Sequence, residues 1–152
     1  MNRKAISELV STVLLVLITI AAVGIIWGAI MPIIRSNLET SQKCAGAELR
    51  VNTESGYTYL SSFPTVTNIT VQISRGASTV ALNGIQLKFT DSKGDSKTET
   101  NSTYPEANAD KIYVYSNNSL GISSDVKKVG VAAIVRIGNT DTICPAQEFD
   151  IK

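Results

Sequence analysis

The chain has 152 residues, a formal net charge of +1 and 18% charged residues, which is below the roughly 25% typical of soluble domains. This balance lacks the basic footprint of a nucleic-acid-binding protein. The sequence contains no histidine, which excludes Ser-His-Asp and Cys-His catalytic pairs and His-ligated metals. Its two cysteines, Cys44 and Cys144, are too few for a Cys-rich zinc site or an iron–sulfur cluster. We therefore expect neither an enzyme nor a bound cofactor or metal.

An uncharged apolar run occupies positions 9–34 and reads LVSTVLLVLITIAAVGIIWGAIMPII. As a helix it would be roughly 39 Å long, and a bilayer core needs about 20 such residues. The apolar residues surround the helix axis instead of forming one stripe, which is unlike a surface helix of a globular domain. Residues 6–35 are therefore predicted to form a transmembrane helix.

Four polar or special positions qualify this prediction. Ser11, Thr12 and Thr19 are tolerated because their hydroxyls bond back to helix carbonyls. Pro32 lacks an amide donor and is expected to kink or end the helix near Met31.

The sequence from residue 36 onward has a different composition. It carries 11 of the 14 basic and 12 of the 13 acidic residues, and it is rich in Ser, Thr, Asn and Gly. Residues 36–43 are predicted to be a linker and residues 44–152 a separate head domain. Arg3 and Lys4 precede the apolar run, so the positive-inside rule favours a cytoplasmic N-terminus and an exported head.

Two features agree with export. In an oxidising compartment Cys44 and Cys144 would pair, and closing a loop of about 100 residues contributes up to ~4.7 kcal/mol; the alternative is two buried free thiols. Three Asn-x-Ser/Thr triplets are candidate N-glycosylation sites, although such triplets also arise by chance in a head rich in these residues. They begin at Asn68, Asn101 and Asn117.

The head shows the period-two alternation of β-strands, with Asn, Asp, Gly and Ser clusters between the strands. The expected strands are 48–52, 66–73, 85–90, 111–115, 129–137 and 147–151. About seven short strands in a chain of this length predict an immunoglobulin-like antiparallel sandwich. The complete fold class is then α+β: a long N-terminal hydrophobic helix followed by an all-β head. Asp91 and Asp95 flank Gly94 but do not match a calcium-binding loop, so we interpret them as a hairpin tip.

The N-terminus carries the most specific signal. Lys4-Ala5 stands directly before Ile6-Ser7-Glu8 and the long apolar run. This arrangement resembles the class III signal peptide of archaeal type IV pilins, in which a membrane aspartic peptidase cuts after a basic residue and a small one. The resemblance implies that residues 1–5 are removed, with Lys4, Ala5 and Ile6 forming the cleavage site, and that the apolar helix is retained.

The resemblance also implies a function. The chain would be inserted in the cytoplasmic membrane and then polymerise through its helix into a surface filament for adhesion. Its partners would be the prepilin-peptidase-like protease, an assembly ATPase, a membrane platform protein and further copies of itself. Glu8 would neutralise the deep end of the helix during membrane exit and pair with the new ammonium of Ile6; the alternative is an acid that caps the first turn. Gly24 and Gly28 would permit close helix packing, although glycine is also frequent in membrane helices in general.

Two other functions remain open from the sequence. The first is an archaellin, which shares the architecture, although the Gly-rich helix start usual in that family is missing here. The second is a single-pass membrane protein that anchors an extracellular binding module. A pilin loses residues 1–5, whereas an anchored module retains them.

Overall fold

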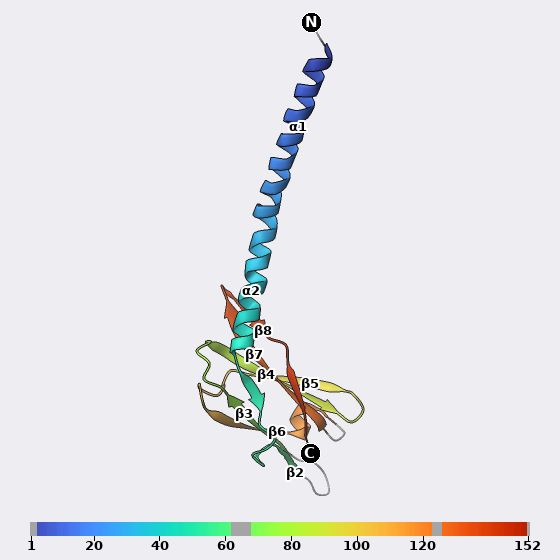
Figure 1. Cartoon of the computed structure of the whole chain (residues 1–152). Helices are drawn as coiled ribbons and strands as arrows, with labels where there is room; N and C mark the ends of the chain where they lie inside the picture. Colours follow the sequence, from blue (N-terminus) through green and yellow to red (C-terminus); the bar gives the residue numbers. More distant parts are fainter. Residues whose placement is uncertain (1–2, 62–67, 123–125, 152) are drawn as a thin grey trace. The chain divides into compact units, whose positions relative to one another are not determined.

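The computed structural model describes residues 3–61, 68–122 and 126–151. The chain divides into two compact units, Met1–Glu39 and Thr40–Lys152. The first unit is helical. The second contains the end of a helix and two β-sheets (Figure 1).

Three consecutive helical elements follow one another at the N-terminus. They are the α-helix α1 (Arg3–Ile25), the π-helical turn η1 (Ile26–Ile30) and the α-helix α2 (Met31–Gly46). Pro32 stands in the first turn of α2, where its missing N–H costs little. In an unbroken α-helix its ring would clash with the carbonyl of Gly28, and the wider π-turn directly before it avoids that geometry. The helix therefore does not end near Met31.

The segment 36–43, predicted as a linker, is helical because α2 continues through it to Gly46. The boundary between the two compact units, after Glu39, lies within this segment. Lys43 in the last turn is favoured by the helix dipole. The segment therefore connects the units as helix and not as irregular chain.

The first sheet has four antiparallel strands: β1 (Leu49–Val51), β2 (Tyr59–Ser61), β3 (Asn68–Arg75) and β6 (Asp110–Ser116). Strand β6 pairs with β3 along residues 68–74. Because β1 and β2 pair with the two ends of that same stretch, they share the opposite edge of β3. Strand β3 is thus the centre of this sheet.

The second sheet has five antiparallel strands, ordered β5-β4-β7-β8, with β9 also pairing with β7. Their bounds are β4 (Leu82–Asp91), β5 (Ser96–Asn101), β7 (Val126–Ile137), β8 (Thr140–Ile143) and β9 (Gln147–Asp150). A single-turn helix, α3 (Asn117–Leu120), follows β6 where the sequence predicted a turn, and Gly121 ends it in the left-handed conformation.

One hydrophobic core is shared by both sheets. Alternate residues of β4 are buried, as the period-two pattern predicted. In β3, by contrast, every residue from Ile69 to Ile73 is buried, so both faces of that strand are covered. The rings of Phe89 from β4 and Tyr115 from β6 meet edge to face with centroids 5.2 Å apart, which joins the two sheets directly. The fully buried side chains of the core include Ile69, Val71, Ile73, Ile85, Leu87, Phe89, Val129 and Val135.

Candidate functional site: the exposed helix and the disulfide

The apolar helix exposes large side chains on every side. From Val10 to Ile34 its Val, Leu, Ile and Trp side chains are 45% to 70% exposed, and Met31 is half-buried. Among the described residues, one helix, counted from Val10 to Gly46, is long and apolar enough to cross a membrane. A membrane anchor and a signal sequence both fit this finding.

Within this helix, a threonine bonds to the helix backbone, and two glycines have open space beside them. The Thr19 hydroxyl donates to the Val16 carbonyl at 2.8 Å, as expected for a threonine in an apolar helix. Gly24 and Gly28 lie one turn apart, and a Cβ added at either position would meet nothing within 4 Å. The space beside both glycines is therefore open to another helix.

The predicted cleavage residues lie at the start of α1. Lys4, Ala5, Ile6 and Glu8 belong to the helical backbone of Arg3–Ile25. The side chains of residues 3–9 lie outside the described part of the chain. The predicted pairing of Glu8 with the new amino group of Ile6 therefore stays a prediction.

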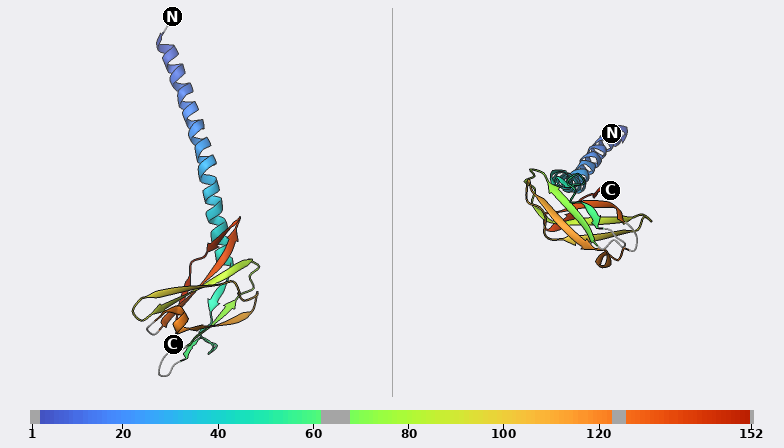
Figure 2. Two further views of the ribbon diagram at one scale, coloured as in Figure 1. Left: turned by 180° about the vertical axis from the view of Figure 1, so that it is seen from behind. Right: turned by 90° about the horizontal axis from the view of Figure 1, so that it is seen from below.

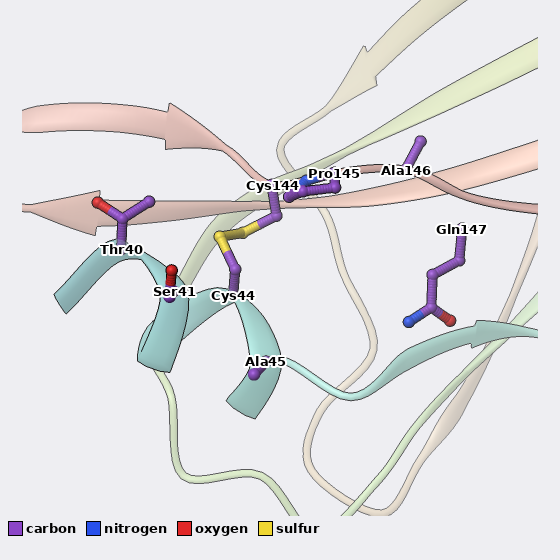
Figure 3. Close-up of a pocket in the computed structure, with 8 residues that line it drawn as sticks. All are labelled: Thr40, Ser41, Cys44, Ala45, Cys144, Pro145, Ala146 and Gln147. Carbon is purple, nitrogen blue, oxygen red and sulfur yellow. A yellow bond between two sulfur atoms is a disulfide. The ribbon is translucent and has the colours of Figure 1, made fainter. Parts of the chain in front are cut away.

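The disulfide between Cys44 and Cys144 is present, which confirms the predicted pairing (Figure 3). It joins the last turn of α2 to the segment between β8 and β9, with the two Cα atoms 5.4 Å apart. The Cys144 amide also donates to the Ala133 carbonyl of β7 at 2.9 Å. The last turn of α2 is thus fixed covalently to the second sheet.

Further bonds hold the end of α2 in place. The Lys43 ammonium donates to the Arg136 carbonyl at 2.8 Å, and the Ser78 hydroxyl donates to the Gly46 carbonyl. The second bond satisfies one of the last carbonyls of α2, which have no partner within the helix, and the first ties the Lys43 side chain to β7. The helix end is therefore an integral part of the head.

A pocket of about 410 Å³ lies beside the disulfide. Figure 3 shows its lining: Thr40, Ser41, Cys44, Ala45, Cys144, Pro145, Ala146 and Gln147. None of these side chains titrates, since both cysteines are oxidised. The pocket offers small apolar surface and a few uncharged hydrogen-bonding groups, and no acid, base or nucleophile.

The Asp91–Asp95 segment is the tip of the β4–β5 hairpin, as interpreted from the sequence. The Asp91 carboxylate accepts the amides of Lys93 and Asp95 at 2.8 and 2.9 Å. This is a side chain stabilising its own turn. Among the described residues, no group of three or more His, Cys, Asp or Glu is placed to hold a metal ion.

The three predicted glycosylation asparagines differ in their surroundings. Asn68 is exposed at the start of β3. Asn101 is half-exposed at the end of β5, and its side-chain oxygen accepts both the amide and the hydroxyl of Thr103. Asn117 is the first residue of α3, and its side chain lies outside the described part. Asn68 and Asn117 come close together, because Asn68 pairs with Ser116.

The outer surface of β6 is an apolar feature that was not predicted from the sequence. Ile112 and Val114 are exposed there, while Tyr113 and Tyr115 face the core. The available signal was the run Ile-Tyr-Val-Tyr, in which apolar and aromatic residues occupy both faces of a strand.

Comparison of this chain with protein-family models, curated proteins and solved structures found no match.

Proposed function

We propose that the chain is a structural subunit of an archaeal type IV pilus that polymerises through its N-terminal helix into an adhesive surface filament. The observation that carries this proposal is the all-round exposure of large apolar side chains from Val10 to Ile34. Burial of each is worth roughly 1.5–3 kcal/mol. Such a helix requires a bilayer first and the helices of other copies afterwards.

The N-terminal residues give the proposal its pathway. A prepilin-peptidase-like protease would cut between Ala5 and Ile6, removing two positive charges, Arg3 and Lys4, while retaining the helix. An assembly ATPase and a membrane platform protein would then drive extraction. A head-to-tail arrangement that does not close on itself gives an open helical filament.

The head would lie outside the cell, at the filament surface. Its two antiparallel sheets around one core support an immunoglobulin-like sandwich. The Cys44–Cys144 disulfide supports an oxidising, exported location. N-glycans would attach at Asn68, Asn101 or Asn117, and the protein would have a structural, non-enzymatic role.

The decisive experiment is mass spectrometry of the native polypeptide with electron microscopy of sheared surface filaments. We expect a chain beginning at Ile6 within polymeric fibres. The variant Ala5→Leu, which removes the small residue before the cut, should keep Met1 and stay in the membrane, and Asn2→Ala serves as its control. A native chain that keeps Met1 and disperses singly in detergent would overturn the proposal in favour of a single-pass anchored module.

Glu8 gives a separate prediction within this proposal. A carboxylate at the helix start is favoured by the helix dipole and would pair with the Ile6 ammonium of its own or a neighbouring copy. Glu8→Ala should therefore reduce filament yield while the membrane-inserted precursor accumulates to the normal level. Glu8→Asp, which keeps the charge, is the matched control, and wild-type yield from Glu8→Ala would refute the role.

A further inference from the structure

Strand β6 forms one free edge of the first sheet. It pairs along its whole length, Asp110–Ser116, with β3 (Figure 2, second view). No described residue pairs with its other side. A strand of this kind presents a row of unpaired backbone groups to the surroundings.

The hydrogen bonds of β3 show which residues of β6 carry those groups. The Gln72 amide donates to the Thr58 hydroxyl at 3.1 Å, and the Gln72 carbonyl accepts the Asn52 amide at 2.8 Å. Both backbone groups of Gln72 therefore point away from β6. In an antiparallel pair the directions alternate along the strand. The residues of β6 that lie opposite Gln72 and Thr70 thus direct their own N–H and C=O to the free edge; they are Ile112 and Val114.

The other sheet edges among the described residues are protected. Strands β1 and β2 have three residues each, and β8 and β9 have four each. Strand β5 is longer but reads Ser-Lys-Thr-Glu-Thr-Asn, with both charges and no apolar residue. Short strands and charges are the usual means of preventing edge-to-edge pairing. Strand β6 has seven residues, and its charges, Asp110 and Lys111, stand at one end.

The side chains on the outer face of β6 add an apolar surface at this edge. Ile112 is 46% exposed and Val114 is 61% exposed. Val114 lies in one cross-strand row with Thr70 and Tyr59, and the Tyr59 ring is also exposed. The same two residues, Ile112 and Val114, thus offer both unpaired backbone groups and uncovered apolar side chains.

From these observations we infer that β6 is a self-association surface, whose occupant is β6 of a second copy of this chain. With the two strands antiparallel and a two-fold axis at Tyr113, Ile112 lies opposite Val114 of the second copy, and Val114 opposite its Ile112. Each of these pairs exchanges two backbone hydrogen bonds, because both members direct their groups to the edge. The four side chains form one apolar cluster on the outer face, and Asp110 lies opposite Ser116. Self-complementarity of the strand in this register is what identifies the occupant.

The contact is weak for a single pair of heads. The surface that one seven-residue strand edge can bury is smaller than the roughly 800 Å² per partner that stable complexes bury. Many heads held in an array would bind together through multivalency. A two-fold contact closes on itself, so it joins two assemblies and does not lengthen one. If the heads belong to filaments, the contact therefore associates filaments side by side.

Cysteine cross-linking of the full-length chain tests the register. Chains carrying Ile112→Cys are mixed with chains carrying Val114→Cys, in detergent at high concentration, and oxidised with copper phenanthroline. Cα atoms in a hydrogen-bonded antiparallel pair are about 5.5 Å apart, within disulfide range. The mixture should form covalent dimers several-fold faster than either variant alone. In this register Ile112 does not lie opposite Ile112 of the second copy, and Val114 does not lie opposite its Val114. Equal rates in all three samples would overturn the inference.

A charge placed on the free edge of β6 tests whether this edge causes side-by-side association. Val114→Lys should abolish side-by-side association of otherwise wild-type chains. Added to the Ile112→Cys chains, it should lower their cross-linking to Val114→Cys chains at least tenfold. Thr98→Lys on the charged β5 edge should change neither result. Filaments that assemble but do not cross-link would refute this inference and leave the proposed function standing. Cross-linked dimers of a chain that never polymerises would refute the proposed function alone.

Discussion

Tyr113 is the buried tyrosine that most directly couples the head to pH. Its hydroxyl donates to the Thr103 carbonyl at 2.8 Å, which ties the end of the β5–β6 connection to β6. Burial raises the pKa of Tyr113 above its ordinary value, and the neighbouring Tyr115 raises this pKa further. Burial likewise raises the pKa of Tyr115. The folded head therefore resists deprotonation of both phenols.

The sign of the pH dependence follows from these raised pKa values. Below about pH 10, the ordinary tyrosine pKa, both the folded and the unfolded chain keep the phenols protonated. Above it the unfolded chain loses the protons first, so the free energy of unfolding falls as pH rises. Tyr113→Phe should lose about 0.5–1.5 kcal/mol at neutral pH with the Thr103 bond, yet show a shallower fall above pH 10.

The measurement is denaturant unfolding of the full chain at pH 7 to 11.5, monitored by far-ultraviolet circular dichroism. Tyr57→Phe, in an exposed loop, is the matched control and should reproduce the wild-type curve. A Tyr113→Phe curve parallel to wild type above pH 10 would contradict the assignment.

Among the elements, the disulfide and the bonds around it fix the last turn of α2. The two cysteines are 100 positions apart, so reduction opens nearly the whole head. The double variant Cys44→Ser/Cys144→Ser should lower the free energy of unfolding by up to ~4.7 kcal/mol, mainly because the unfolded chain gains freedom. In urea unfolding, dithiothreitol should lower the free energy of unfolding of the wild type by a similar amount. It should leave that of the double variant unchanged. Equal midpoints for the oxidised and reduced wild type would contradict this role.

The elements differ in how far the sequence determines them. Strand β4 alternates buried and more exposed residues, while β3 and β7 are mostly buried runs rich in β-branched residues, so all three were predictable to within a few residues. Strand β5 contains no apolar residue, and its conformation comes from pairing with β4. Residues 36–46 are polar without a clear stripe, and their helix is fixed by contacts distant in sequence, such as Lys43 to Arg136.

The candidate site was predictable to a similar degree. Two cysteines in a head that was expected to be exported to an oxidising compartment were enough to predict their pairing. The free edge of β6 was not predictable, because it depends on which strands flank β3. Two short strands, β1 and β2, share one side of β3 and leave β6 alone on the other. Pairing partners of this kind are set by the whole fold and not by the strand's own residues.

On the scale of the whole molecule, the helix and the head have opposite relations to water. The head covers its apolar residues with its own chain, in a core that includes Phe89 and Ile69. The helix leaves its apolar residues exposed from Val10 onward. In the proposed filament the helix would therefore drive assembly, and the head would form the exposed surface.

Close packing of neighbouring helices beside the two glycines can be tested by filling that space. Gly24 and Gly28 lie on one face, and no described atom of the chain fills the space beside either glycine. Gly28→Leu should therefore leave the precursor folded and membrane-inserted but reduce filament yield several-fold, since the added side chain separates neighbouring backbones. Ala22→Leu is the matched control: at 100° per residue it lies about 160° from Gly24, on the opposite face. Quantitative microscopy of sheared filaments, with precursor levels measured in the membrane fraction, would detect the difference. Equal loss from both variants would mean that helix packing is tight on every face and that the glycine pair has no special part in it.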